Sequence, residues 1–287
     1  FRVAIRRTRV ALSQVKHVLP EDVVLRFKEF FSWLGQITGE TRDLDVYLIN
    51  FDLYKKKLPS VIRQSINPLQ HFLAAKKQKS HKQLNKKLRS AKYLTLLAEW
   101  EAYLSSNPLN NPSEPPDAKL NIKELADRRI WKTYRLAIKE GKAIDRQSPP
   151  EALHKLRKTC KKLRYLMEFF QSLYPEDRID KLIKRLKQLQ DVLGDYQDYS
   201  VQQERLQQFS EEMQAINTPS RTFLAMGVLI QDFENRKLKA RDSFTAQFSA
   251  FNKHDAHVLF RELFATKKSK DDASRPEGST LAMPEAL

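Results

Sequence analysis

Apolar residues recur every three or four positions along most of the chain, which is the period of an amphipathic helix. The clearest apolar stripe lies within residues 151–170 and consists of Leu153, Leu156, Cys160, Leu163, Met167 and Phe170. A weaker stripe of the same period opens the chain and consists of Phe1, Ile5, Thr8, Leu12 and Val15. Both segments are therefore predicted to be helices that bury one face.

Proline positions and the lack of alternating patterns support the same interpretation for the rest of the chain. Proline favours the ends of helices over their interiors, and the prolines that stand where the helical stripes begin or end are Pro20, Pro59, Pro149 and Pro175. No segment alternates apolar and polar residues convincingly with the period of two that a half-buried strand requires. The pattern predicts an all-α fold in which helices pack as bundles.

The chain also repeats itself at an offset of 155 residues. At this offset the opening "FRVAIRRTR" aligns with "LRKTCKKLR" (residues 156–164), Gly39 with Gly194, and Asp43 with Asp198. Because two separate segments agree on one offset, we expect two similar halves related by a pseudo-twofold axis. The predicted division is a first bundle over residues 1–105, a Pro/Asn-rich linker over 106–120, a second bundle over 121–265 and a disordered tail over 266–287.

Charge and cysteine content narrow the possible partners. Lys and Arg number 52 against 35 Asp and Glu, a formal net charge of +17, which favours a polyanion or an anionic surface as partner. The single cysteine, Cys160, permits no intrachain disulfide, which favours a reducing compartment. Since Cys160 lies on the apolar stripe, we interpret it as a small buried side chain and not as a catalytic thiol. No apolar run approaches the roughly 20 residues of a membrane span.

A second, basic stripe runs beside the apolar one on each of the two repeated helices. On the later helix it consists of His154, Arg157, Lys158, Lys161 and Arg164. On the first helix the basic residues are Arg2, Arg6, Arg7 and Arg9. The pattern predicts no acidic partner one turn away on this face, and like charges one turn apart repel by a few tenths of a kcal/mol. A solvated face chosen for solubility is the simpler interpretation, but the recurrence favours a binding partner.

Two further basic ridges accompany these stripes. One ridge, before the later helix, consists of Arg128, Lys132, Arg135 and Lys139. The other, in the first half, includes Lys82, Lys86 and Arg89. If the helices pack side by side, the ridges could line a common groove or channel, and the alternative is basic charge scattered over the surface.

Acidic residues follow a glycine in both halves, and they are Glu40, Asp43, Asp195 and Asp198. Paired carboxylates suggest a metal ion or acid–base chemistry. We favour a structural role, because acidic groups in the first turn of a helix interact well with its dipole and can hold neighbouring Arg side chains. The histidines show no metal-ligand spacing, and no phosphate-binding glycine loop or nucleophile motif is present. The sequence therefore predicts no catalytic residue, metal or cofactor.

Five motifs in order and spacing resemble the CHAD domain family, named for a conserved histidine in an α-helical domain. They are "FRVAIRRTR", "LGQITGETRDLDVYL", "LRSAKYLTLLAEW", "LHKLRKTCKKLRYLMEFF" and "LKQLQDVLGDYQDYSV". The resemblance covers nearly the whole chain, although Lys replaces Arg at several places. It implies two four-helix bundles around a basic central channel, binding of inorganic polyphosphate, and a cytoplasmic location at polyphosphate granules. His154 matches one named histidine of the family, and its counterpart at the same offset would precede Phe1.

Two other functions compete with polyphosphate binding. Sequence-independent nucleic-acid binding fits the basic charge, but the basic face carries few aromatic side chains on which bases could stack, Tyr165 being the exception. A metal-dependent hydrolase of phosphate chains would need a cluster of carboxylates beside the basic groups, which the sequence lacks. We therefore expect a protein that binds polyphosphate without being an enzyme, with no membrane partner.

Overall fold

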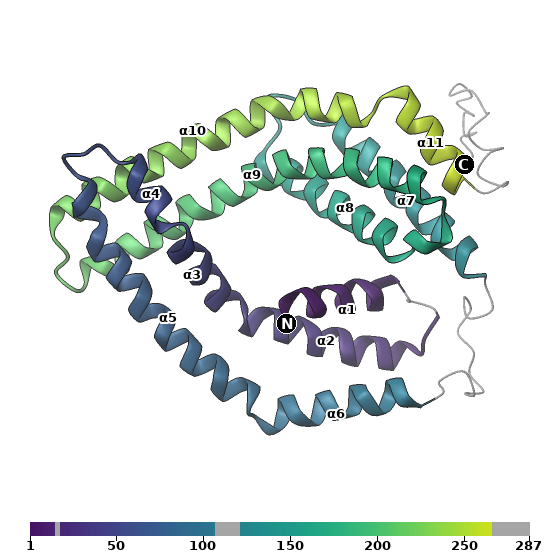
Figure 1. The fold of residues 1–287 in the computed structure, drawn as a ribbon, viewed down its shortest axis with the longest axis horizontal. Helices are drawn as coiled ribbons and strands as arrows, with labels where there is room; N and C mark the ends of the chain where they lie inside the picture. Colours follow the sequence, from purple (N-terminus) through teal and green to yellow (C-terminus); the bar gives the residue numbers. More distant parts are fainter. Residues whose placement is uncertain (15–17, 107–120, 266–287) are drawn as a thin grey trace, which may run out of the picture.

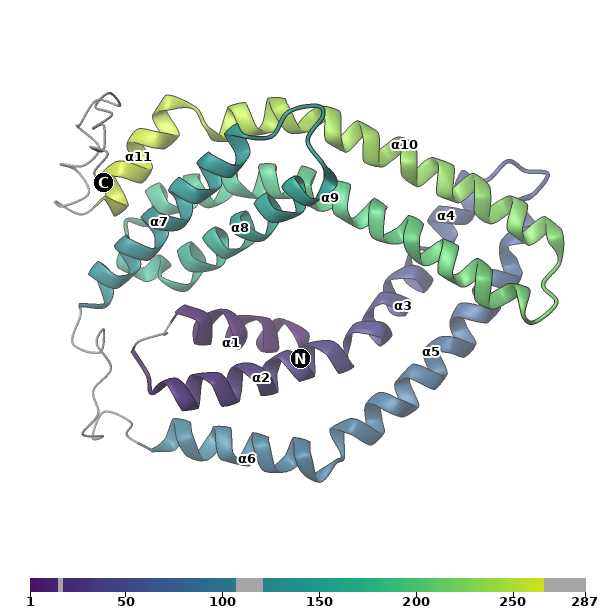
Figure 2. The same cartoon turned by 180° about the vertical axis from the view of Figure 1, so that it is seen from behind.

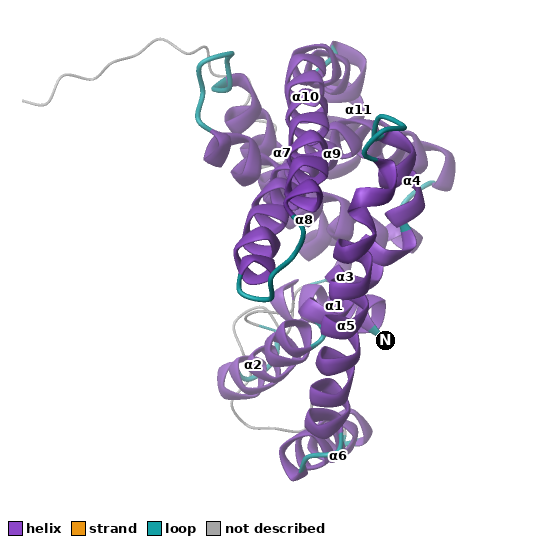
Figure 3. Ribbon diagram, turned by 90° about the vertical axis from the view of Figure 1, so that its left-hand side faces the viewer, coloured by secondary structure: helices purple, strands orange, loops and turns teal. Residues whose placement is uncertain are grey.

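The structure is a computed structural model and describes residues 1–14, 18–106 and 121–265. Every regular element in these ranges is a helix, which confirms the all-α prediction (Figure 3). The predicted linker 106–120, apart from Ser106, and the predicted tail 266–287 lie outside the described residues. Within the described ranges no helix combines the length and the apolarity that crossing a bilayer requires.

Most of the helices follow one another along the chain with short connections, and residues 106–121 separate α6 from α7 (Figure 1). Those of the first half are α1 (Arg2–Gln14), α2 (Glu21–Ile37), α3 (Gly39–Ile49), α4 (Phe51–Lys57), the short 3-10 helix η1 (Arg63–Ile66), α5 (Asn67–Leu88) and α6 (Ala91–Ser105). Those of the second half are α7 (Ile122–Lys142), α8 (Pro150–Phe169), the 3-10 helix η3 (Gln171–Leu173), α9 (Glu176–Gln214), α10 (Ser220–Phe251) and α11 (His254–Phe264).

Helix α8 forms where the sequence predicts it. Pro150 occupies its first turn, where a missing backbone N–H costs nothing, and the helix ends at Phe169. All members of the predicted stripe are buried, namely Leu153, Leu156, Cys160, Leu163, Met167 and Phe170. Helix α1 is held less firmly, because Ile5 and Leu12 are buried but Phe1 is 63% exposed. The last member of its predicted stripe, Val15, lies outside the described residues.

Three hydrophobic clusters hold the helices together. The first joins α7, α8 and α11 to the beginning of α9 and the end of α10. The second joins α3, α4 and α5 to the other ends of α9 and α10 through Leu44, Leu69, Phe209 and Phe233. The third lies between α1, α2 and α6. The long helices α9 and α10 run side by side and carry the second half across to the first (Figures 1 and 2).

The offset of 155 residues is visible in the helices themselves. Helix α2 begins at Glu21 after Pro20, and α9 begins at Glu176 after Pro175, which is the same position shifted by 155. The Tyr47 hydroxyl donates to the Gln202 carbonyl at 2.8 Å, so two residues separated by 155 positions meet. The pseudo-twofold relation of the two bundles as a whole stays a prediction.

The two halves differ where the acidic residues follow a glycine. In the first half Thr38 separates α2 from α3, and its Oγ1 donates back to the Leu34 carbonyl at 2.8 Å. In the second half α9 runs through Gly194 without a break. The backbone of Gly194 has no positive φ, and the buried residues Leu189, Leu193 and Tyr196 continue one face of the helix on both sides of it. The prediction that Asp195 and Asp198 stand in the first turn of a helix is therefore wrong.

Candidate anion-binding site on α1 and α8

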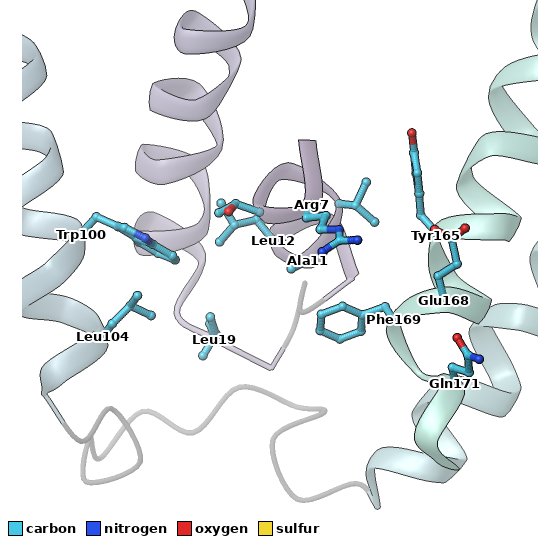
Figure 4. A pocket seen from close by; sticks show the side chains of 12 residues that line it. Arg7, Ala11, Leu12, Leu19, Trp100, Leu104, Tyr165, Glu168, Phe169 and Gln171 are labelled. Carbon is cyan, nitrogen blue, oxygen red and sulfur yellow. The ribbon is translucent and has the colours of Figure 1, made fainter. Parts of the chain in front are cut away.

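The basic helices α1 and α8 face each other across the molecule (Figure 1). Arg6 Nη1 donates to the Tyr165 hydroxyl at 3.2 Å, and this contact joins residues 159 positions apart. Figure 4 shows Arg7, also from α1, reaching toward Tyr165 and Phe169 of α8. Two helices that are far apart in the sequence thus bring their cations to one region.

Lys161 lies at the centre of this region. Its pKa is lowered to about 8, first by burial and then by the positive charges of Arg157 and Arg6, with Arg164 adding to them. Asp198 is the one nearby group that acts in the opposite direction. We call Arg6, Arg157, Lys161 and Arg164 the α1–α8 cluster. Four cations lie close together here, and two carboxylates oppose them, Asp198 beside Arg157 and Glu168 beside Arg164, so the region keeps a net positive charge.

Arg157 is more buried than Arg164, since its side chain is 16% exposed and that of Arg164 is 23% exposed. Its Nη2 donates to Asp198 Oδ1 of α9 at 3.2 Å, which fixes the direction of the side chain. Its Nε is buried and has no hydrogen-bond partner among the described residues. A buried donor without a hydrogen-bond partner destabilises the folded protein. An oxyanion that accepted a hydrogen bond from this N–H would remove that cost, which favours its binding.

Arg164 is more heavily engaged than the other members. Its Nε lies 3.3 Å from Glu168 Oε1 one turn later, and its guanidinium lies 5.4 Å from the centre of the Tyr165 ring. The prediction that the basic face has no acidic partner one turn away is therefore wrong for Arg164. Glu168 lies at the edge of the stripe, and an arginine side chain is long enough to reach it.

Arg2 and Arg9 hold α1 on α2. Arg2 Nη1 donates to Thr38 Oγ1 at 2.7 Å and to the Gly35 carbonyl at 3.3 Å, and burial lowers the pKa of Arg2. Asp43 acts in the opposite direction, and Arg6 adds to the lowering. Arg9 lies across Gly35, because a Cβ built there would stand 3.1 Å from Arg9 Nη1. Both arginines thus combine a basic charge with a structural contact.

His154 is positioned by α9. Its Nδ1 lies 2.6 Å from Gln197 Oε1, so an Nδ1–H donates to the amide oxygen and Nε2 is left for a second partner. Lys158, one turn later on the same face, is exposed and has no partner among the described residues. These two residues extend the row of the α1–α8 cluster toward the beginning of α8.

The ridge on α7 lies beside a different part of α8. Lys132 and Arg129 lower the pKa of Lys162, after the larger effect of desolvation, which places them near Lys162. Arg128 pairs with Glu124 at 3.2 Å, one turn earlier on its own helix. Arg135 and Lys139 are exposed. No contact between described residues joins this ridge to Arg6 of α1.

The ridge on α5 is separate from the cluster as well. Lys82 and Lys86 are exposed on the second half of α5, and the exposed Arg89 directly follows its last residue; no contact in the described part of the chain links these residues to α1 or α8. The structure thus brings together the basic residues of α1 and α8 and leaves those of α5 apart.

The acidic residues support neighbouring side chains. Asp198 accepts from Arg157, and Asp43 lies 3.6 Å from Arg205. Glu40 stands exposed in the first turn of α3. The pKa of Asp195 is raised by burial and then by Asp198 and Asp191. Among residues 1–14, 18–106 and 121–265, no group of three or more His, Cys, Asp or Glu side chains is arranged to hold a metal ion.

A sequence model of the CHAD domain matches residues 1–207 of the chain. This chain belongs to the CHAD domain family. The matched range contains α1, α8 and the part of α9 that supplies Gln197 and Asp198, so the whole α1–α8 cluster and its partners fall within the family's common region. Helices α10 and α11 lie beyond it.

Individual relatives agree with this assignment. The uncharacterized protein Rv2226 of Mycobacterium tuberculosis (strain ATCC 25618 / H37Rv) is 24% identical in an alignment of 264 residues that covers 87% of this chain and 48% of that protein. The CHAD chain thus spans about half the length of the curated relative.

Two solved structures share the fold. The CHAD domain from the plant Ricinus communis superposes with a TM-score of 0.67 at 23% identity, over 87% of this chain and 80% of that one. PptA from Streptomyces chartreusis superposes with a TM-score of 0.61 at 17% identity, over 86% of this chain and 87% of that one. At these identities the likeness concerns the fold alone.

The sequence did not assign three side chains to this CHAD site, although Tyr165 was recognised there as an aromatic residue of the basic face. Tyr165 is the link between α8 and Arg6, and Gln197 and Glu168 position His154 and Arg164. Gln197 stands next to Asp198 in the repeated acidic motif, which is the one signal that pointed to this part of α9. Helical periodicity shows which residues share a face but does not show which helices meet, so the contact of Tyr165 with α1 had no signal.

Proposed function

We propose that this CHAD domain binds inorganic polyphosphate at the α1–α8 cluster and does not transform it. The observation that carries the proposal is the position of Lys161 among three guanidinium groups from both halves, where the cations outnumber the nearby carboxylates Asp198 and Glu168. Polyphosphate offers a closely spaced row of anionic oxygens and no bases. Arg suits such a ligand because its planar fork can donate to two phosphate oxygens, while Lys adds a mobile point charge.

The fixed geometry of α8 supports the proposal further. Leu156, Leu163 and Met167 are completely buried on the opposite face of the helix from solvent, so the basic row stands on a well-packed core. Arg157 is held by Asp198, and His154 by Gln197. A preorganised row of donors loses little side-chain entropy on binding, which favours a rigid rail for a flexible polyanion. If the polymer accumulates in granules, the bound protein would accumulate with it.

Nucleic-acid binding has less support at this site. Tyr165 is the aromatic residue of the basic face, and its hydroxyl and its ring both already contact other residues of the protein. Its hydroxyl accepts from Arg6, and the guanidinium of Arg164 lies over its ring at 5.4 Å. A base that stacked on this ring would have to compete with Arg164. The surface therefore offers charge for a phosphate backbone but little for the bases.

Equilibrium binding of several polyanions tests the proposal. The full chain is titrated with long-chain polyphosphate, ATP, single-stranded DNA and duplex DNA at one ionic strength, and phosphate release is assayed in the same samples. We expect long polyphosphate to bind at least about 100-fold more tightly than ATP, because it engages many cations at once. Its affinity should fall linearly with salt on logarithmic axes. Equal or tighter binding of DNA would support the nucleic-acid alternative, and release of phosphate would support an enzyme.

A further inference from the structure

A pocket of about 760 Å³ lies between α1, α6 and α8, next to the basic cluster but distinct from it (Figure 4). This volume falls in the range of pockets that bind small organic molecules, roughly 300 to 1,000 Å³. Most of the wall is apolar, and its larger side chains are Leu12, Leu19, Trp100, Leu104 and Phe169. Figure 4 shows Trp100 and Leu104 on one side and Phe169 on the other.

Two of the larger apolar side chains of this pocket are open to solvent, although Leu12 is buried. Leu104 is 62% exposed and Phe169 is 50% exposed. Helix α6, which contributes Leu104 and Trp100, has no buried residue in the structure although it is rich in apolar side chains. Exposed apolar surface that is gathered in a concave site is typical of a place where a ligand binds.

One end of the pocket is positive. Arg7 lines it, and this side chain is exposed and has no ion pair or hydrogen bond among the described residues. Tyr165 stands beside Arg7 and belongs to the neighbourhood of Arg6 (Figure 4). The carboxylate in the lining, Glu168, is already paired with Arg164 at 3.3 Å. A ligand would therefore meet an available guanidinium at this end and apolar side chains elsewhere.

We propose that this pocket binds a free amphiphile with a single alkyl chain and an anionic head, of the chemical class of the fatty carboxylates. The chain would lie against Trp100, Leu104 and Phe169, and the head would accept hydrogen bonds from Arg7. Charge complementarity selects the anionic head, because the unpaired group in the lining is a cation. This site is additional to polyphosphate binding and does not depend on it.

Calorimetric titration with monomeric dodecanoate tests the proposal on the full chain, with dodecyl maltoside as a probe of equal tail and neutral head. We expect saturable binding of one dodecanoate, and about 10-fold weaker binding of dodecyl maltoside, since a charge-assisted hydrogen bond is lost. R7Q should reduce the dodecanoate affinity about 10-fold and leave that of dodecyl maltoside within about 2-fold.

A matched pair of leucines on α6 tests the apolar wall. Leu104→Gln should weaken both probes about 5-fold through lost apolar contact, whereas Leu94→Gln, at a comparably exposed leucine outside the pocket, should change neither. Polyphosphate affinity should be unchanged in both variants. If Leu104→Gln fails to fold, Phe169→Gln on α8 replaces it.

Several results would overturn the pocket assignment. They are equal affinity for the charged and neutral probes, equal effects of the two leucine variants, and the absence of saturable dodecanoate binding. Binding to anionic vesicles without binding of free dodecanoate would assign the surface to membranes instead. If polyphosphate fails to bind while dodecanoate binds as expected, the proposed function fails and the pocket stands.

Discussion

Helices α1 and α8 align with each other in the sequence at the offset of 155 residues, yet the two helices are packed very differently. Seven side chains of α8 are buried, and six of them belong to the large cluster that includes α7, α9 and α11. In α1 the buried side chains of the small third cluster are Ile5 and Leu12. The basic rows of the two helices are alike, but only one of them stands on a deep core. We interpret α8 as a helix whose position is rigidly fixed by its core, and α1 as a helix whose position can adjust to a bound ligand.

The equivalent arginines Arg2 and Arg157 show the same difference. Arg2 donates to Thr38 and to a backbone carbonyl at the break between α2 and α3. Arg157 donates to a carboxylate on the unbroken α9 and keeps a buried Nε without a partner in the described residues. Arg2 thus stabilises the junction of α2 and α3, whereas Arg157, at the aligned position of the other half, keeps an N–H donor available. The comparison leads to three predictions of decreasing effect.

Core truncation should affect the two helices unequally. Leu163→Ala removes a fully buried side chain of the large cluster and should lower the free energy of unfolding by about 3 kcal/mol. Ile5→Ala, in the small cluster, should cost about 2 kcal/mol, because the edge of the fold can relax around the change. Urea unfolding of the two variants measures the difference. Equal losses would contradict the distinction between a rigid and an adjustable helix.

The pKa of Lys161 predicts how polyphosphate affinity depends on pH. In the free protein this pKa is about 8, and a bound phosphate would raise it. Lys161 is charged in both states below pH 7, but above pH 8 the free protein must take up a proton to bind. Affinity should therefore fall as pH rises through 8, by roughly 5-fold up to pH 9.5.

Lys161→Arg is the control for this pH dependence, because arginine stays charged throughout the range. The decline above pH 8 should largely disappear in this variant. A decline of the same size in the variant and the parent protein would assign the titration to another group.

Removal of the acidic partner should have the smallest effect. Asp198→Asn weakens the ion pair with Arg157. Because the Asp198 side chain is 64% exposed, the expected loss of stability is about 0.5 kcal/mol. Polyphosphate affinity should stay the same or rise, because a competing carboxylate has gone. Thermal unfolding and a polyphosphate titration measure both quantities. A lost affinity would show that the hold of Asp198 on Arg157 matters more than its competition with the bound anion.

The local features of the fold could be predicted from the sequence, whereas the contacts between helices could not. The stripe of α8 and the prolines that precede α2 and α9 were sufficient to predict those helices, because helical periodicity and helix starts are local properties. Gly39 and Gly194 look alike in the sequence, and only the buried face that continues through Tyr196 decides that one begins a helix and the other lies within one.

The candidate site divides in the same way. The residues of the basic rows on α1 and α8 were predictable, since each row is a pattern along one helix. The meeting of Arg6 with Tyr165 was not, and neither was the separation of Lys86 from the cluster, because both depend on how distant helices cross. The packing of α9 and α10 against α3, α4 and α5 was not predictable for the same reason.

The central claim is that geometry on α8, and not net charge, binds polyphosphate. The most direct measurement compares the double variant Arg157→Gln/Lys161→Gln with Lys56→Gln/Lys239→Gln, which removes the same charge from exposed positions on α4 and α10. At one ionic strength we predict about a 30-fold loss of polyphosphate affinity in the first variant and less than about a 2-fold loss in the second. Equal losses in two folded variants would contradict the claim and leave non-specific attraction as the explanation.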